Sequence, residues 1–461
     1  MKNQQSLSYI IILTLVATLG GLLFGYDTAV ISGAEKSIQT FLIDRLNLSS
    51  LAHGATVSSA LIGCIIGGAI SGLCASRLGR KKTLIVAAVL FFISALGSGQ
   101  PEFLFFAKGK VTMGLLYAFN FYRIIGGIGV GLASAVSPMY ISEIAPAHIR
   151  GRLISFNQFA IIFGMLVVYF VNWSIAKGQS IVWINTIGWR YMFMSEAIPA
   201  ATFGILLIFV PETPRYLAMH NQHEKALSIL ERINGFDRAQ TILEDIKRTM
   251  DKSSAKLLAY GSTVIIIGIL LSVFQQFVGI NVALYYAPRI FESMGAAKDA
   301  SLLQTIVMGF VNVMFTVIAI LTVDKWGRKP LLITGSIGMA IGMIAIGMLS
   351  FFNIIGISTL VFIIIYTASF MMSWGPICWV LIGEIFPNKI RGKAIAIAVA
   401  VQWASNYFIS STYPAMMEFS GGLTYLFYGL MSILSALFVW KMIPETKGKT
   451  LEEMEHLFKK R

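Results

Sequence analysis

The stretch SRLGRKKTLI at residues 76–85 recurs as DKWGRKPLLI at residues 324–333, and each copy lies between two long apolar runs. Two further stretches recur in the same order, namely SEIAPAHIRGRL (142–153) as GEIFPNKIRGKA (383–394) and PETPRYL (211–217) as PETKGKTL (444–451). Three repeated pairs in one order indicate that the chain consists of two duplicated halves.

The chain around these repeats is strongly apolar. Of its 461 residues, 56% are hydrophobic and 13% are charged, whereas a soluble domain has about 25% charged residues. A membrane-spanning helix needs about 20 mostly apolar residues. Twelve such runs are present, at 8–32, 53–75, 83–100, 112–142, 153–176, 189–210, 256–291, 300–322, 331–350, 356–385, 393–417 and 423–442. The sequence therefore predicts an all-α integral membrane protein with twelve transmembrane helices.

The repeats divide these runs into two pseudo-symmetric six-helix bundles. The predicted domains are an N-terminal bundle at 1–210, a cytoplasmic linker with short helices at 211–255, a C-terminal bundle at 256–442 and a cytoplasmic tail at 443–461. Parallel duplicated halves that enclose a site near the middle of the bilayer are a transporter design.

The net charge of +14 could suggest a nucleic-acid partner, but the placement of the bases argues against one. Lys and Arg gather in short segments between the apolar runs, mostly on the side of the N-terminus. Cytoplasmic loops carry such an excess of positive charge. We therefore expect the lipid bilayer as the surroundings, both termini in the cytoplasm and no nucleic-acid partner.

Motifs of enzymatic or metal chemistry do not appear in the sequence. Cys64, Cys74 and Cys378 lie in apolar stretches without metal-ligand spacing, so free thiols are expected. The glycine-rich run at 126–131 has no preceding strand and no G-K-[ST], and its Gly127 and Gly131 have the spacing of a helix-packing face. We expect no enzyme, no cofactor, no metal and no ATP-driven pump.

The repeated motifs resemble those of the sugar porter family of the major facilitator superfamily. The matching stretches are GRKK (79–82), RIIGGIGVG (123–131), PETPR (211–215), QQFVGIN (275–281), DKWGRK (324–329) and PETKGKT (444–450). Longer stretches, such as ATLGGLLFGYDTAVISG at 17–33, are similar to the family's bacterial carriers of D-xylose and protons. The resemblance implies a proton-coupled monosaccharide importer of the bacterial inner membrane, with D-xylose expected, that works by alternating access. We expect it to function as a monomer, because one chain supplies a complete pathway.

Asp27 is the candidate proton-coupling residue. It lies in an apolar run, where an isolated carboxylate is costly and must be paired, protonated or facing water. Arg123 lies at a comparable depth in another run and is the expected partner. Glu196 is a second acid within a span, and it either joins the coupling network or anchors helix ends. The alternative for Asp27 and Arg123 is a static buried ion pair.

Neutral hydrogen-bonding side chains in the spans are candidates for a sugar site. A carboxamide both donates and accepts hydrogen bonds, as a sugar hydroxyl does, and aromatic faces cover the apolar surface of the ring. The resemblance implies sugar contacts at Gln158, Gln275, Gln276, Asn281, Tyr285, Asn312, Trp379, Gln402 and Trp403. Phe24 is a candidate aromatic wall. The alternative is that these groups only join helices to one another.

Met165 departs from the pattern that the resemblance implies. It shares a helix face with Gln158, seven residues earlier. The family's xylose carriers have Gln at this place, and Met offers no comparable hydrogen bond. The prediction that the substrate is a sugar is therefore better supported than the prediction that this sugar is D-xylose.

The repeated cytoplasmic motifs carry acids and bases at matching places. We interpret them as ion-pair latches of a cytoplasmic gate, formed by Arg80, Glu143, Arg150, Glu212, Arg328, Glu384, Arg391 and Glu445. The alternative is that these bases only obey the positive-inside rule. Ser76 replaces the Asp324 of the other half, which predicts a weaker latch in the first half.

Three other functions remain open. A passive sugar uniporter would not accumulate its sugar, and Asp27 argues against it. A sugar sensor built on a transporter fold would usually carry long cytoplasmic extensions, and this chain ends soon after PETKG. A drug antiporter would favour a broad apolar cavity over a cluster of Gln, Asn and Trp.

Overall fold

The structure is a computed structural model. It describes residues 2–103, 106–107, 109–146, 149–250, 262–293, 295–352, 354, 356–386 and 390–447. Within these residues, twelve helical segments are long and apolar enough to cross a membrane, and there is no β-strand. The fold class predicted from the apolar runs is therefore correct.

The N-terminal half contains the first six spans. Its long helices are α1 (Lys2–Ile38), α3 (Ser59–Arg77), α4 (Arg80–Gly99), α5 (Met113–Ile144), α6 (Arg150–Ala176) and α9 (Ala197–Phe209). Short elements extend them, namely η1 (Gln39–Ile43), η2 (Asp44–Leu46), α2 (Ser50–Val57), α7 (Ile181–Trp183), η3 (Ile184–Gly188) and α8 (Trp189–Met194).

The linker and the C-terminal half follow. The linker forms α10 (Pro214–Met219), α11 (His223–Asn234) and α12 (Phe236–Met250). The second half contains α13 (Thr263–Phe277), α14 (Ile280–Tyr285), α15 (Ala287–Ser293), α16 (Lys298–Trp326), α17 (Arg328–Phe351), α18 (Ile357–Met372), α19 (Trp374–Ile385), α20 (Arg391–Phe419) and α21 (Gly421–Met442). Three short helices therefore lie between Pro214 and Met250. The domain boundaries at 255–256 and the tail beyond residue 447 lie outside the described residues.

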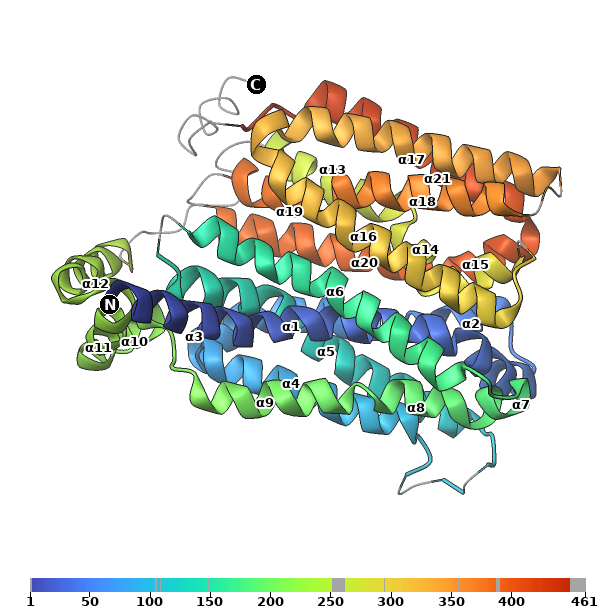
Figure 1. Ribbon diagram of the computed structural model, residues 1–461, viewed down its shortest axis with the longest axis horizontal. Helices are drawn as coiled ribbons and strands as arrows, with labels where there is room; N and C mark the ends of the chain where they lie inside the picture. Colours follow the sequence, from blue (N-terminus) through green and yellow to red (C-terminus); the bar gives the residue numbers. More distant parts are fainter. Residues whose placement is uncertain are drawn as a thin grey trace.

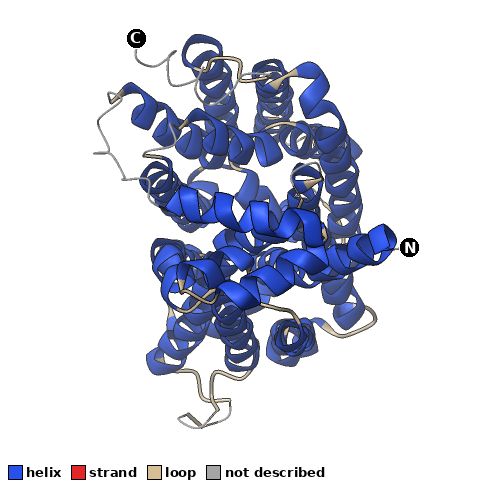
Figure 2. Ribbon diagram, turned by 90° about the vertical axis from the view of Figure 1, so that its left-hand side faces the viewer, coloured by secondary structure: helices blue, strands red, loops and turns tan. Residues whose placement is uncertain are grey.

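The long helices run roughly along one axis of the molecule, with the two halves on opposite sides of it (Figure 1). Helices α10, α11 and α12 lie together at one end, which we call the linker end, and α2, α7 and α15 lie at the other, which we call the far end. A view onto the linker end shows the long helices nearly end-on (Figure 2). Such an arrangement places the boundary between the halves along the axis of the molecule.

Several predicted spans are interrupted in the structure, two of them at positions that matter for the arrangement of the halves. The apolar run predicted at 256–291 is interrupted at Gly279, between α13 and α14, and again before α15. The run predicted at 53–75 begins within α2 and is interrupted at Ser58 before α3. Hydropathy marks the length of an apolar run, but it does not register the backbone dihedrals that break a helix inside it.

Candidate functional site

A cavity of about 80 Å³ lies between the two halves, lined by side chains from both. Nine of the ten predicted sugar contacts line it, namely Phe24, Gln158, Gln275, Gln276, Asn281, Tyr285, Trp379, Gln402 and Trp403. Asn312, the tenth, is buried in α16 and is not part of this lining. The cavity therefore brings together residues that are hundreds of positions apart in the sequence.

The amide side chains of the C-terminal half form a connected hydrogen-bond chain. Gln276 donates to Gln275 Oε1 at 2.8 Å, and Asn281 donates to Gln276 Oε1 at 2.5 Å. Gln402 also donates to Gln275 Oε1, and Gln275 in turn donates to the carbonyl of Trp374 at 3.3 Å. Each amide is thus held in one orientation by its neighbours, which prepares the wall of the cavity before any ligand arrives.

The interruption of the seventh span orients these amides. Gly279 has φ +90°, a left-handed conformation that favours glycine. Its N–H bonds to the Gln276 carbonyl at 2.9 Å, and the hydroxyl of Tyr366 donates to the Val278 carbonyl at 2.8 Å. The backbone groups freed at the break are therefore partly satisfied, and Gln276 and Asn281 on either side of it contact each other.

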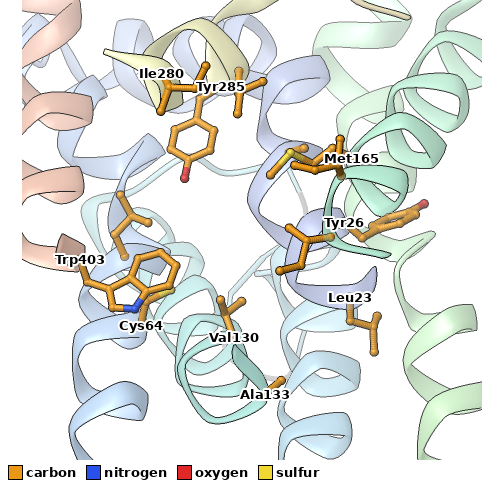
Figure 3. Close-up of a cluster of buried hydrophobic side chains, with 14 of the residues drawn as sticks. Leu23, Tyr26, Cys64, Val130, Ala133, Met165, Ile280, Tyr285 and Trp403 are labelled. Atoms are coloured by element: carbon orange, nitrogen blue, oxygen red, sulfur yellow. The ribbon is translucent and has the colours of Figure 1, made fainter. Parts of the chain in front are cut away.

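Aromatic rings form the other walls. The rings of Phe24 and Trp403 come from opposite halves, and their centroids lie 5.5 Å apart. Tyr285, Trp403 and Met165 belong to three different helices and surround the same space, with the Tyr285 hydroxyl pointing away from α14 (Figure 3). Asn406 donates to that hydroxyl at 3.3 Å. The lining thus combines flat apolar faces with fixed polar groups, as ligand cavities usually do.

Asp27 and Arg123 form the predicted ion pair. Arg123 Nη1 lies 2.7 Å from Asp27 Oδ1, and Arg123 Nη2 donates to the Asp27 carbonyl at 3.1 Å. Both residues are at most 1% exposed. The guanidinium also lies over the ring of Phe193, 5.2 Å from its centroid. The pair is therefore fully enclosed by protein in this conformation.

Glu196 lies beside this pair, between α8 and α9. It is fully buried, and the charges of Asp27 and Arg123 both act on it. A glycine makes room for the group, because a Cβ on Gly126 would lie 3.2 Å from Asp27 Oδ1 and 2.3 Å from Ser94 Oγ. Two buried carboxyl groups thus lie near one guanidinium, which contacts Asp27 and can compensate only one negative charge.

The first set of gate residues forms a bracket within the N-terminal half at the linker end. Arg80 Nη2 contacts Glu143 Oε1 at 2.8 Å, and the Thr213 hydroxyl donates to Glu143 Oε2 at 2.5 Å. Glu212 accepts hydrogen bonds from the backbone N–H groups of Arg80 and Lys81, each at 3.1 Å. The bracket fixes the starts of α4 and α10 to the end of α5.

The second half repeats this bracket. Arg328 Nη2 contacts Glu384 Oε1 at 2.9 Å, and Thr446 donates to Glu384 Oε2 at 2.6 Å. Glu445 accepts from the N–H groups of Arg328 and Lys329, each at 3.0 Å. The duplication seen in the sequence is therefore present in the side-chain contacts as well. In both halves these observed pairs join helices of the same half.

Glu212 and Glu445, which occupy matching positions in the two brackets, differ in acidity. Burial raises the pKa of Glu212, against the effect of its backbone N–H donors. Burial also acts to raise the pKa of Glu445, but it is weaker there, and the N–H groups of Lys447, Arg328, Lys329 and Thr446 lower the pKa below its usual value. The difference follows from Glu212 being the more enclosed of the two.

One further predicted gate residue, Arg150, takes part in no ion pair among the described residues. Arg150 donates through Nε and Nη2 to the carbonyl of Ala145, each at 3.4 Å, and so caps the end of α5. The side chain of Arg391 lies outside the described part of the chain. Thr213 and Thr446 were not predicted, although the matching Thr in the two PET motifs is a signal that could have identified them.

A second cavity, of about 260 Å³, adjoins the first on the side of the linker end. The two share Phe24, Gln158, Ile161 and Trp379. The second cavity is bordered by Ile154 near the start of α6 and Val323 near the end of α16, and these helices belong to different halves. The central cavity is thus continuous with space toward the linker end.

Comparison with known proteins gives a consistent result. A family model described as "Sugar (and other) transporter" matches residues 13–458. The D-xylose-proton symporter of Escherichia coli is 55% identical over 99% of this chain and 97% of its own length. The glucose facilitated diffusion protein of Zymomonas mobilis is 39% identical over 100% of this chain and 99% of its own.

A solved structure matches the fold. It is an inward-open conformation of the xylose transporter of Escherichia coli, with a TM-score of 0.88 and 54% sequence identity over 97% of this chain and 99% of that one. The similarity therefore covers both halves and the boundary between them, where the amide-lined cavity lies.

Proposed function

The chain belongs to the sugar (and other) transporter family, and from this membership we propose that it imports a monosaccharide, with D-xylose expected, together with protons. The observation that carries the proposal is the cavity between the halves, where fixed amides and aromatic rings meet. These groups suit a neutral ligand that is rich in hydroxyl groups and has apolar C–H faces.

The cavity offers a sugar several polar atoms that no protein group occupies. Among the described residues, Trp403 Nε1 and Gln402 Oε1 are buried without a hydrogen-bond partner. A buried donor or acceptor that lacks a partner is costly, so a ligand hydroxyl that reaches these atoms gains affinity. Both residues line the cavity, and a hydroxyl group can donate to one of these atoms or accept from the other.

Proton coupling runs through the Asp27–Arg123 pair. When Asp27 binds a proton, its charge is lost and Arg123 is left with a weaker partner in a buried setting, where an unpaired charge is costly. The helices that carry the two residues, α1 and α5, then favour a different packing. Protonation thereby changes the balance between the outward-facing and inward-facing states. Glu196, as the second carboxyl group, receives the released guanidinium.

Alternating access follows from the two halves moving about the cavity. The linker end faces the cytoplasm, in keeping with the distribution of Lys and Arg, and the wider space toward that end provides the exit. The brackets at Glu143 and Glu384 tie helix ends together within each half, so each half moves as a unit. One chain in the lipid bilayer of the cytoplasmic membrane supplies the whole pathway, without a cofactor or another protein.

Uptake of radiolabelled D-xylose into proteoliposomes tests the proposal, measured with and without an inward proton gradient and with D-glucose as competitor. Accumulation above the external concentration that collapses with an uncoupler is the expected result. Equilibration without accumulation would support the second candidate, facilitated diffusion, which the 39% identity to the Zymomonas mobilis protein favours. A transport-competent preparation that moves neither sugar overturns the substrate assignment.

Replacing Asp27 with Asn separates coupling from binding. The amide keeps the size of the side chain but cannot ionise, so Asp27→Asn should abolish gradient-driven accumulation. D-xylose binding, measured by isothermal titration calorimetry, should change by less than about threefold, because Asp27 does not line the cavity. Gln276→Ala is the matched variant, and its binding should weaken by about tenfold or more, since it loses hydrogen bonds to the sugar. Accumulation that survives in Asp27→Asn would refute the coupling role.

A further inference from the structure

The far end of the molecule contains a charge cluster that takes no part in the sugar cavity or in the Asp27–Arg123 pair. Glu35 and Lys36 are adjacent residues near the end of α1, in the N-terminal half. Arg289 and Glu292 lie three residues apart on α15, in the C-terminal half, and so share one face of that helix. The cluster therefore spans the boundary between the halves.

Two ion pairs cross this boundary. Arg289 contacts Glu35 through two nitrogens, with Nη2 2.6 Å from Oε1 and Nε 3.1 Å from Oε2. Lys36 contacts Glu292. Arg289 also donates to the side-chain oxygen of Gln39, which lies in the N-terminal half. The acid and base of one half thus face the base and acid of the other, and this order allows both pairs to form in only one alignment of α1 against α15.

The first pair is enclosed more deeply than the second. The Glu35 side chain is 2% exposed, whereas that of Lys36 is 56% exposed. The imidazole of His53, on α2, lies 3.2 Å from Glu35 Oε1 and is itself buried. Edge-on to His53 lies the ring of Tyr286 from the C-terminal half, 6.5 Å away between centroids. Glu35 is thus enclosed with Arg289 as its charged partner, and it keeps that partner only while the boundary is closed.

Close backbone packing shuts the same end. A Cβ on Gly54 of α2 would lie 1.9 Å from the carbonyl oxygen of Ser411 on α20, so these helices of opposite halves touch there. Ser50 donates to Glu418 across the same contact. The space left between Glu35, Lys36, Arg289 and Glu292 is only about 20 Å³, close to the volume that one water molecule needs. A monosaccharide cannot pass here.

We propose that the Glu35–Arg289 and Lys36–Glu292 pairs form an outer latch, which holds the far end closed and must break each time the carrier opens to the outside. The latch rests on the alternating-access part of the proposed function, but not on the identity of the sugar. Its pairs form only when α1 and α15 are together, so they stabilise the inward-facing state relative to the outward-facing one. Loss of either pair should shift the population toward the outward-facing state.

The latch is tested by measuring the opening of the far end directly. Cysteines replace Gln179, just after α6, and Asp299, near the start of α16, in a chain whose three native cysteines are changed to Ser. Both sites are exposed, and their helices belong to opposite halves. Spin labels at these sites report the distance between the halves by double electron–electron resonance, on purified protein without sugar and without a proton gradient.

Glu35→Gln and Arg289→Gln should each raise the ratio of open to closed molecules by about tenfold or more, as expected for breaking a buried pair. The double variant should show no larger change than either single one, because both remove the same interaction. Lys36→Gln and Glu292→Gln should act in the same direction but more weakly, since that pair is more exposed. This second pair keeps the test valid if a variant at the buried pair does not fold.

Arg45→Gln is the matched control. Arg45 is a charge at the same end, and it lies over the ring of Phe41 in its own half, 4.8 Å from the centroid. The distance distribution between the spin labels in the Arg45→Gln variant should equal that of the wild type. Unchanged distributions in all four latch variants, or fully additive effects in the Glu35→Gln/Arg289→Gln double variant, would overturn the proposal. If the latch variants shift the distances as expected but the protein transports no sugar, the latch proposal stands and the proposed substrate is rejected.

Discussion

At Met165 the cavity wall presents a side chain that cannot exchange hydrogen bonds with a sugar hydroxyl as an amide does. Met165 is 7% exposed and lies in the lining together with Gln158 from the same helix. Placing an amide at this position should add one hydrogen bond to a bound sugar. We therefore expect Met165→Gln to tighten D-xylose binding by about two- to tenfold, the range that a net neutral hydrogen bond supplies.

Isothermal titration calorimetry on the purified carrier measures this change, and Met165→Leu is the control. Leucine has a similar volume and no polar atom, so its dissociation constant should stay within about threefold of the wild type. If Met165→Gln binds D-xylose no more tightly than Met165→Leu, then the sugar does not approach this side of the cavity. The specificity would then have to arise from the amides of the C-terminal half.

At the scale of elements, the break between α13 and α14 decides how the amides face the cavity. Gly279 is held at φ +90°, and a Cβ there would lie 2.8 Å from the ring of Tyr428. Gly279→Ala therefore adds both a strained backbone, which costs about 1–2 kcal/mol, and a clash with a buried ring. We expect a lower melting temperature together with sugar binding weakened by about tenfold.

Gly72→Ala is the control for this substitution. Gly72 lies in α3, and a Cβ there meets no atom within 4 Å. Alanine favours a helix over glycine by up to about 1 kcal/mol, so the variant should be as stable as the wild type or slightly more so. Thermal unfolding in detergent measures both variants. An equal melting temperature for Gly279→Ala and the wild type would show that the ring of Tyr428 moves aside at no cost.

The sequence predicts such elements only in part. Apolar length identified every span, because the bilayer sets a minimum that short-range packing cannot change. A broken helix around Gly279 that aims side chains inward could be expected from the sequence, but the ring of Tyr428 opposite that glycine could not. Asn312 shows the same limit, because the sequence looks the same whether a buried amide in a span faces a cavity or a neighbouring helix. The structure puts it outside the lining.

At the scale of the whole molecule, the internal repeats were the most informative feature of the sequence. They predicted two halves, and the structure repeats the bracket contacts of Arg80 with Glu143 in those of Arg328 with Glu384. The outer cluster was not predicted, because Glu35 and Arg289 lie in segments that do not repeat. Only the folded chain brings them together, and a single sequence holds no signal for such a contact between halves.

Pseudo-symmetry does not make the two brackets equal in their response to pH. The pKa of Glu445 is lowered in the folded state, so its carboxylate stabilises the fold above the usual carboxyl pKa, and this contribution is lost as the pH falls through the lowered value. The pKa of Glu212 is raised instead. Its contribution is fully present below the usual carboxyl pKa and is lost as the pH rises through the raised value.

Glu445→Gln and Glu212→Gln should therefore respond to pH in opposite directions. Relative to wild type, the destabilisation by Glu445→Gln should grow between about pH 4 and about pH 7, whereas that by Glu212→Gln should shrink. Because both groups are partly exposed, we expect each change to be on the order of 0.5 kcal/mol. Thermal unfolding across this range measures it, with Lys441→Gln as the control for charge loss at the same end. Parallel curves for the two Glu variants would mean that the brackets are electrostatically equivalent, and that the deeper burial of Glu212 has no energetic consequence.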